Sequence, residues 1–307
     1  MLSISHLTHV YPNGTRALDD VSLEVPRGMF GLLGPNGAGK STLMRSIATL
    51  QIPTSGSIRV GLDGQAIDVL REPARVRATL GYLPQDFGVY PRVSALDMLD
   101  HLAVLKGITQ RADRRATVEA LLAQVNLWDV RKKAIAGFSG GMRQRFGIAQ
   151  ALIGSPQLII VDEPTAGLDP EERNRFNNLL AEIGENVVVI LSTHIVDDVA
   201  DLCARMAIIA EGRIVLQGVP HELIERLNGR VWRRTIDRAG LDACRREFNV
   251  ISTRLREGRT VVHVTADARP GPEFDPVEAV LEDVYVATLA AHRRAGAERA
   301  ALETGTA

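Results

Sequence analysis

The chain has 307 residues, which suggests about two domains at the usual ~150 residues per domain. Hydrophobic residues make up 45% of it and charged residues 24%, a composition that excludes a fibrous or wholly disordered protein. The formal net charge is −1, so the chain has no overall basic excess that would attract nucleic acid or anionic lipid. No nucleic-acid partner is therefore expected.

The cysteines and the apolar stretches exclude further classes. Cys203 and Cys244 lie outside any CxxC or Cys/His cluster, which argues against a disulfide framework and a zinc site. Residues 1–9 lack the basic and apolar regions of a secretory signal, and no apolar stretch approaches the ~18 residues that a membrane span requires. We therefore expect a cytoplasmic chain, in which any membrane-crossing part of the function belongs to another polypeptide.

The first elements predict a strand-rich start. Residues 2–25 alternate apolar and polar side chains around the turn Pro12-Asn13-Gly14, which predicts a β-hairpin. The apolar run Met29–Leu33 predicts a buried strand that ends in a glycine-rich loop. Helical spacing then follows from Lys40, with apolar positions at Leu43, Ile47 and Leu50.

Helices and strands alternate in the rest of the first 228 residues. Helical periodicity from Ser94 to Leu127, broken once at Gly107, predicts a helical subdomain at about residues 86–156. Three short apolar runs separated by helical stretches then predict a mainly parallel sheet. These runs are Leu158–Val161, Val187–Leu191 and Met206–Ile209. The expected class of this first domain is therefore α/β.

A new pattern starts after Asn228-Gly229, the predicted domain boundary. A strand at Arg230–Ile236, a helix near Gly240–Phe248 and a hairpin that turns at Glu257-Gly258 predict a small α+β domain over residues 229–290. Residues 291–307 are rich in Ala, Arg and Glu without an apolar face, and we expect them to be disordered.

Residues 34–42 read GPNGAGKST and match the pattern GxxxxGK[ST] between a predicted strand and a predicted helix. The candidate nucleotide-binding residues here are Gly34, Asn36, Gly37, Ala38, Gly39, Lys40, Ser41 and Thr42. Small residues let backbone amides wrap a phosphate chain at the positive end of a helix, while Lys40 reaches the β- and γ-phosphates and Ser41 can ligate Mg²⁺. The alternative is a glycine-rich turn that binds nothing.

Two carboxylates follow the apolar strand Leu158–Val161. It would cost roughly several kcal/mol to bury Asp162 and Glu163 without partners. A bound magnesium nucleotide would remove that cost. Asp162 is placed to hold the metal, directly or through water, and Glu163 to act as general base on the attacking water. The alternative is that the two acids cap the following helix.

Ser139, Gly140 and Gly141 precede another predicted helix. A serine N-cap with two glycines exposes backbone NH groups and predicts a second anion site. A plain helix cap is the alternative for these residues alone.

Together these motifs resemble the ATP-binding subunit of an ABC transporter, over residues 2–228. Three further motifs appear in the order which that family shows, namely Tyr82-Leu83-Pro84-Gln85, Ala166-Gly167-Leu168-Asp169 and Ser192-Thr193-His194. The resemblance implies a P-loop NTPase core with an N-terminal antiparallel β-subdomain, an inserted helical subdomain and, after residue 228, a small α+β appendage. It also implies head-to-tail dimers, homodimers or heterodimers, in which each ATP lies between one copy's P-loop and the other's Ser139–Gly141.

The same resemblance assigns individual roles. Tyr11 is similar to the aromatic residue that stacks on adenine, with sheet packing as the alternative. Gln85 resembles the glutamine that senses Mg²⁺ and the attacking water, and His194 the histidine that contacts the γ-phosphate, where a structural histidine is the alternative. Asp169 resembles the residue that crosses the dimer interface, with a helix N-cap as the alternative.

The resemblance is incomplete in the segment around Ser139. Phe138 stands where the family usually has Leu, and Met142 where it has Gln. Because Met142 cannot donate the amide hydrogen bond, only Ser139 and the backbone of the two glycines keep the expected phosphate contacts.

Residues 276–285 read PVEAVLEDVY and resemble the closing segment of bacterial exporter ATPases for drugs, lipids or polysaccharides. The alternative is a plain amphipathic helix that buries Val280, Leu281, Val284 and Leu289. The resemblance implies ATP hydrolysis that drives a separate membrane permease for export, at the inner face of the cell membrane. An importer ATPase and a soluble ABC ATPase acting on ribosomes or DNA are the rivals.

The segment Gln85–Ser94 is the predicted contact with the permease. It contains four apolar or aromatic side chains in a turn-like stretch, namely Phe87, Val89, Tyr90 and Val93. Packing beneath the helical subdomain is the alternative for them.

Overall fold

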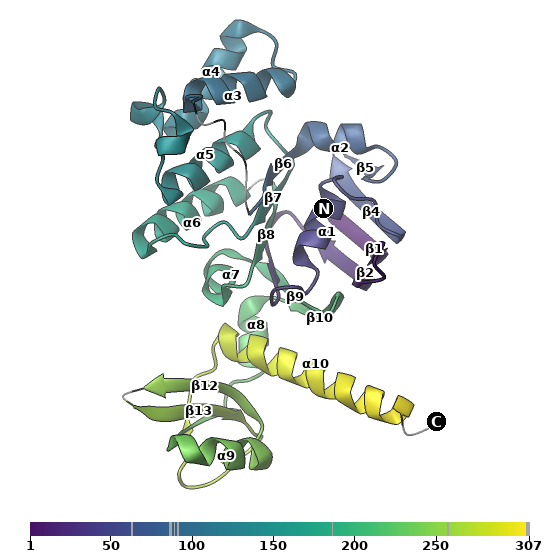
Figure 1. Ribbon diagram of the computed structural model, residues 1–307, viewed down its shortest axis with the longest axis vertical. Coiled ribbons are helices and arrows are strands. Elements are labelled where there is room, and N and C mark those ends of the chain that lie inside the picture. The colour runs from purple at the N-terminus through teal and green to yellow at the C-terminus, as the bar shows by residue number, and fades with distance from the viewer. Residues whose placement is uncertain are drawn as a thin grey trace.

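The computed structural model describes residues 1–304 except 63, 86, 87, 89, 91, 186 and 257, and no side chain is described at 62 or at 299–304. Within this part of the chain, the strands form three β-sheets, and helices pack against them (Figure 1). None of the helices in it is long and apolar enough to cross a membrane.

The N-terminal sheet is antiparallel and has the strand order β2-β1-β4-β5. Its strands are β1 (Leu2–Val10), β2 (Arg16–Val25), β4 (Ser55–Leu62) and β5 (Gln65–Asp68). The predicted hairpin is confirmed: β1 and β2 are joined by a turn in which Gly14 has φ +84° and donates to the carbonyl of Tyr11.

The central sheet has the order β10-β9-β3-β8-β7-β6 and is parallel except at β10. Its strands are β3 (Gly28–Leu33), β6 (Leu80–Leu83), β7 (Leu158–Asp162), β8 (Val188–Thr193), β9 (Arg205–Ala210) and β10 (Arg213–Gly218). The prediction of a mainly parallel sheet is therefore confirmed. Because β3, β7 and β8 run in the same direction, the loops at their carboxyl ends meet at one edge of the sheet.

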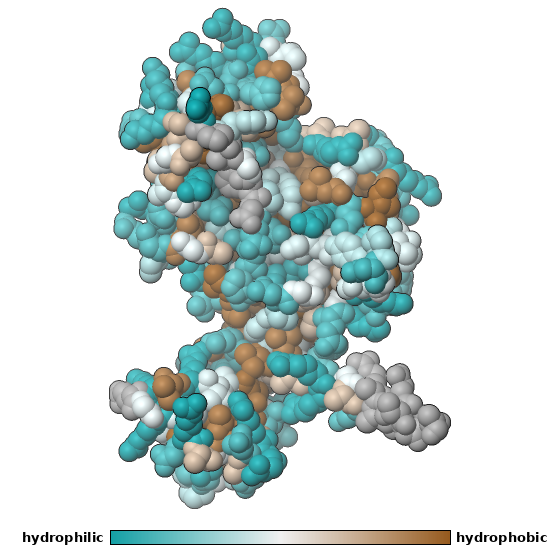
Figure 2. All heavy atoms as spheres, in the orientation of Figure 1, coloured by the Kyte–Doolittle hydropathy of each residue, from teal (hydrophilic) through white to brown (hydrophobic). Residues whose placement is uncertain are grey.

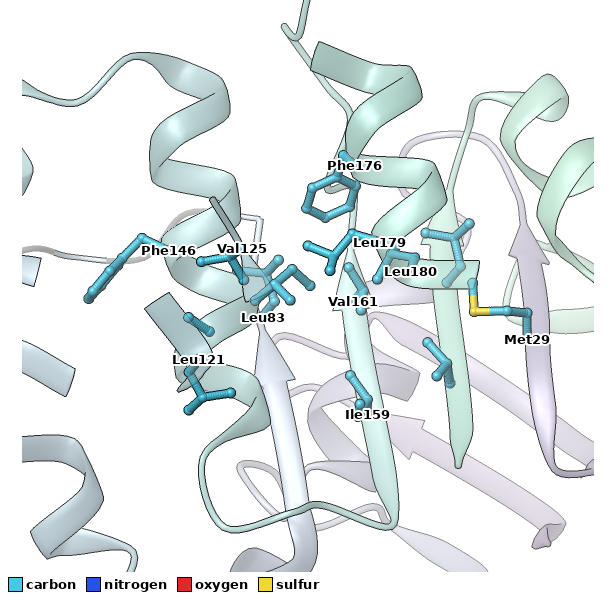
Figure 3. Packing of buried hydrophobic residues seen from close by; sticks show 14 of the residues in the cluster. Met29, Leu83, Leu121, Val125, Phe146, Ile159, Val161, Phe176, Leu179 and Leu180 are labelled. Atoms are coloured by element: carbon cyan, nitrogen blue, oxygen red, sulfur yellow. The ribbon is translucent and has the colours of Figure 1, made fainter. Parts of the chain in front are cut away.

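This sheet separates two apolar cores. Along β7, Ile159 and Val161 face one core while Leu158 and Ile160 face the other, as the pleat of a strand requires. On the first face, Phe176, Leu179 and Leu180 of one helix point towards β7 (Figure 3). The helices of the core are α1 (Lys40–Ile47), α2 (Pro73–Thr79), α6 (Pro170–Gly184), α7 (Val196–Leu202) and α8 (Pro220–Glu225).

A helical region is inserted between β6 and β7 (Figure 1). It comprises α3 (Ala95–Leu105), α4 (Arg111–Gln124), η1 (Trp128–Val130), η2 (Ile135–Gly137) and α5 (Gly140–Leu152). The Ser94 side chain caps α3 by accepting from the Asp97 amide at 3.1 Å, and Gly107, with φ +88°, follows its end. The predicted break at Gly107 is thus confirmed.

The third sheet follows α8 and has the order β12-β13-β11-β14. Its elements are β11 (Val231–Ile236), η3 (Arg238–Gly240), α9 (Leu241–Glu247), β12 (Val250–Arg256), β13 (Arg259–Thr265) and β14 (Asp275–Pro276). The chain then enters α10 (Leu281–Thr304), which lies against α7, α8, β9 and β10 as well as β12. Figure 1 shows α10 extending beneath the central sheet towards the C-terminus.

Several sequence expectations differ from the structure. Leu50 does not continue the face of α1, which ends at Ile47, and it is 61% exposed. Val280 precedes α10 and is half exposed, while Leu281 and Val284 are buried as predicted. Helix α10 continues to Thr304, so the expected disorder from residue 291 is wrong as far as that residue. Glu257 in the predicted hairpin turn, and Phe87 and Val89 in the predicted docking segment, lie outside the described residues.

Candidate nucleotide-binding site

The loop between β3 and α1 depends on glycine at two positions. A Cβ atom on Gly34 would lie 2.5 Å from the Ile209 carbonyl oxygen, and one on Gly39 would lie 2.5 Å from the Ala17 carbonyl oxygen. Gly39, the N-cap residue of α1, also has φ +106°, which side chains rarely tolerate. The loop is therefore packed closely against neighbouring backbone, and its amides surround the start of α1.

A cavity of about 580 Å³ opens beside this loop. Its lining comes from loops that are distant in sequence: Tyr11, Thr15, Arg16, Ala17, Pro35, Asn36, Gly37, Gly39, Lys40, Ser41, Thr42, Gln85, Glu163, His194, Glu211 and Gly212. The fold thus brings most of the predicted nucleotide-binding and catalytic residues to one place.

Lys40 is the buried cation of the cavity, with 6% of its side chain exposed. Its ammonium donates to the carbonyl of Gly34 at 2.6 Å and lies 3.4 Å from Oε1 of Glu163. The Gly34 carbonyl and the Glu163 carboxylate therefore hold the Lys40 ammonium beside the glycine-rich loop.

Glu163 connects two of the predicted residues. Its Oε2 lies 2.6 Å from Nδ1 of His194, while its Oε1 faces Lys40. The carboxylate is buried, whereas half of the His194 side chain is exposed. Glu163 has φ +50°, and its amide donates to the carbonyl of Ser192 at 2.7 Å. The end of β8 thus fixes the unusual backbone that aims this carboxylate into the cavity.

Asp162 has the chemistry of a metal ligand. Burial, together with the neighbouring Glu163, raises the pKa of its carboxyl, and the hydroxyls of Ser41 and Ser192 and the charge of Lys40 offset only part of that effect. Its Oδ1 is buried without a hydrogen-bond partner among the described residues. A divalent cation would offset this burial.

The protein provides few ligands for such a cation. In the described part of the chain, no group of three or more His, Cys, Asp or Glu residues is arranged to hold a metal. Mg²⁺ fits this arrangement, because it is usually bound by one or two protein oxygens together with substrate phosphates and water.

Tyr11 and Gln85 stand at the rim of the cavity. The Tyr11 hydroxyl donates to Oε1 of Gln51 at 3.3 Å and lies 3.0 Å from Oγ1 of Thr42, and its ring packs edge-on against His9. Gln85 is exposed and also lines the cavity. Both positions suit the predicted contacts with a nucleotide.

The second predicted anion site lies elsewhere. Ser139 caps α5 by accepting from the Met142 amide at 3.2 Å, and both Ser139 and Gly140 are exposed. None of Ser139, Gly140 and Gly141 lines the cavity. One copy of the chain therefore does not bring its two predicted anion sites together.

Sequence reasoning missed the turn that joins β9 to β10. Glu211 and Gly212 line the cavity, and the Gly212 amide donates to the Ala38 carbonyl at 3.0 Å. The dipeptide is recognisable in the sequence as a turn, but only the neighbouring positions of β3 and β9 in the sheet place it beside the glycine-rich loop.

Comparisons with known proteins agree with this geometry. The family model described as ABC transporter matches residues 18–166. The daunorubicin/doxorubicin resistance ATP-binding protein DrrA of Streptomyces peucetius is 37% identical over 234 residues, which cover 76% of this chain and 69% of that protein. The methionine import ATP-binding protein MetN of Latilactobacillus sakei subsp. sakei (strain 23K) is 35% identical over 233 residues, 73% of this chain and 67% of that protein.

A solved structure shows the same fold. The dimeric ATP-binding cassette MJ0796, in a post-hydrolysis state bound to ADP and Pi, has a TM-score of 0.64 and 26% sequence identity, and the match covers 71% of this chain and 98% of that one. The chain therefore belongs to the ABC transporter ATP-binding family. It is an ATP-binding ATPase subunit of a transporter.

Proposed function

We propose that two cassettes, of a homodimer or a heterodimer, enclose MgATP head to tail, and that their closure and ATP hydrolysis drive export by a permease on a separate chain. The observation that supports this best is the buried Glu163 carboxylate, which lies between Lys40 and His194 in the cavity beside the glycine-rich loop. Glu163, the proposed general base, thus contacts both Lys40, the proposed phosphate-binding cation, and His194, the proposed orienting histidine.

Each residue has a proposed step. The amides of the glycine-rich loop and Lys40 bind the phosphates, and Tyr11 stacks on the adenine. Glu163 accepts a proton from the attacking water, while His194 holds that carboxylate in place. Mg²⁺, when bound, neutralises phosphate charge, and Ser41, Asp162 and Gln85 are the residues placed to hold it. Ser139, Gly140 and Gly141 of a second copy complete the phosphate contacts, which the exposure of Ser139 and Gly140 allows.

Glu163→Gln tests the proposed chemistry. The amide cannot accept the proton, so the ATPase rate should fall by ~10²-fold or more while MgATP affinity, measured by titration, is retained. Glu182→Gln, an exposed acid on α6, is the matched control and should leave the rate unchanged. Hydrolysis by Glu163→Gln at the rate of the unaltered chain would contradict the role of Glu163.

The export direction rests on two resemblances. The relative DrrA is named for drug resistance, and residues 276–285 are similar to the closing segment of exporter ATPases. The relative MetN is named for import, so the family alone does not set the direction. We propose that the chain acts at the cytoplasmic face of the membrane, held there by its permease.

A groove of about 460 Å³ supports docking to that permease. It is lined by Ala48, Leu50, Arg77, Leu80, Gly81, Tyr82, Leu102, Leu105, Lys106, Gln150, Ala151 and Ile153. Leu50 and Leu105 are 61% and 70% exposed, so two large apolar side chains lie at the surface of the same groove. Within the predicted segment Gln85–Ser94, Tyr90 is exposed, while Val93 packs against the core. We therefore extend the proposed contact to this groove.

A further inference from the structure

The first turn of α6 lies against the first turn of α5. Asp169 caps α6 by accepting from the Glu172 amide at 2.8 Å, which fixes Glu172 in that turn. From there the Glu172 side chain extends to α5, where its Oε1 accepts a hydrogen bond from the Ser139 hydroxyl at 3.2 Å. The carboxylate of Glu172 therefore lies at the N-terminus of α5.

Gly141 shows how closely this carboxylate approaches the helix. A Cβ atom on Gly141 would lie 2.2 Å from the carboxyl carbon of Glu172 and 2.3 Å from its Oε1. The glycine therefore leaves the space in which the carboxylate packs on the backbone of α5. Gly140, by contrast, would meet only a Leu168 methyl, at 3.9 Å.

Two arginines lie near Glu172. Arg145 lies one turn further along α5. Burial lowers the pKa of this arginine, and the nearby Glu172 carboxylate opposes that effect. Arg175 is engaged by Glu171, with Nη2 2.5 Å from Oε1. The Ser139 hydroxyl accepts from the Met142 amide, so its one proton is committed to Glu172.

A carboxylate at a helix N-terminus is stabilised by the same amides and dipole that bind a phosphate. Ser139 and Gly141 are among the residues to which the proposed function assigns phosphate contacts with the nucleotide of a second copy. An approaching triphosphate would meet a like charge there, and it would find the hydroxyl of Ser139 already donating.

We propose that Glu172 is a tethered competitor for the nucleotide phosphate at the N-terminus of α5, and that its displacement sets the MgATP concentration at which two copies close on each other. The inference rests on the proposed function, in which Ser139 acts on the nucleotide of a second copy. Glu172 is a gating residue in this account and takes no part in proton transfer.

The test measures dimerisation in the Glu163→Gln background, where hydrolysis does not reopen the dimer. Size-exclusion chromatography with light scattering gives the MgATP concentration at half dimerisation. Adding Glu172→Gln removes the charge at almost constant size, and it should lower that concentration about tenfold or more. Adding Glu182→Gln, the same change at an exposed acid further along α6, should leave it unchanged. MgATP affinity of the dilute monomer should be equal in all three chains.

Ionic strength separates an electrostatic gate from a structural cap. The difference between the parent and Glu172→Gln should shrink as NaCl is raised, because salt screens exposed charges. Glu172→Asp, which keeps the charge on a shorter side chain, should stay near the parent. The inference is overturned if Glu172→Gln unfolds the chain, or if it leaves the half-dimerisation concentration unchanged or higher, while the Glu163→Gln parent still dimerises. If the parent itself does not dimerise with MgATP, the proposed function fails and the inference with it.

Discussion

Asp198 shows how a buried charge is accommodated next to the site. Its side chain is completely buried in α7, the helix that follows His194. The carboxylate accepts hydrogen bonds from Oγ1 of Thr165 at 2.5 Å, Nε of Arg173 at 2.7 Å and Nδ2 of Asn177 at 3.0 Å. These donors come from the loop after β7 and from α6, so Asp198 joins both to the segment that carries His194. Nothing in the sequence pattern distinguished it from its neighbour Asp197.

Asp198→Ala should be strongly destabilising. It leaves three donors without their acceptor and Arg173 without its ion-pair partner, at a cost of about 3–5 kcal/mol of unfolding free energy. Urea denaturation followed by circular dichroism measures the loss. Asp197→Ala, which removes an exposed acid from the same turn of α7, should change the unfolding free energy by less than about 1 kcal/mol. Similar losses for the two variants would show that the Asp198 network is not a stabilising one.

At the scale of elements, the groove beside β6 separates the helical region from the core sheet. Lys106 holds its two sides together by donating to the carbonyls of Arg77 at 2.9 Å and Leu80 at 2.7 Å. Burial lowers the pKa of Lys106. The exposed Leu105 stands next to this tether at the end of α3. A permease segment seated in the groove would contact both the helical region and the core.

Leu105→Glu should weaken that contact. A charge placed in an apolar interface is desolvated without a partner. The amount of integral-membrane protein that co-purifies with the tagged chain should therefore fall about tenfold or more. Leu255→Glu, on β12 and 75% exposed, is the control for surface charge. Undiminished recovery with Leu105→Glu would exclude the groove. Recovery of ribosomes or DNA with the unaltered chain would favour the soluble rival.

The elements also show which features the sequence could predict. Apolar runs such as Leu158–Val161 identify buried strands, and glycine-rich or acidic residues after them converge because parallel strands end at one edge. The turn at Glu211 could not be placed in the site, because the pairing of β9 with β3 that brings it there is not visible in the sequence. Residues 291–304 were predicted to be disordered because they lack an apolar face. They are helical in the structure, since Ala, Glu and Arg favour helix and the packed first turns of α10 supply the nucleus from which the helix extends.

At the scale of the whole molecule, α10 connects the third sheet to the nucleotide-binding core. Leu281 and Val284 belong to the same buried cluster as Val199 and Met206 of that core. Further along α10, Nε2 of His292 lies 3.3 Å from the carboxylate of Glu211, which also lines the cavity. Figure 2 shows brown, apolar residues where the third sheet meets the core, on a face that is otherwise mostly polar.

A chain that ends at residue 280 should therefore be less stable than the full chain. Without α10, apolar side chains of α7 and β9 become exposed, and each buried Leu or Val contributes about 1.5–3 kcal/mol. We expect a lower melting temperature and aggregation on size-exclusion chromatography. A chain that ends at Gly296 keeps the packed turns of α10 and should behave as the full chain does. A stable, monodisperse chain ending at 280 would show that α10 is dispensable for the fold.

The backbone at Glu163 has a consequence for how this protein can change over time. A residue other than glycine held at φ +50° costs roughly 1–3 kcal/mol, so the orientation of that carboxylate lowers the stability of every folded copy. Selection for folded stability alone would favour substitutions that relax this backbone conformation. Only selection for ATP hydrolysis would remove them. A lineage that no longer needs transport should therefore lose the acid at position 163 early, while the surrounding sheet persists.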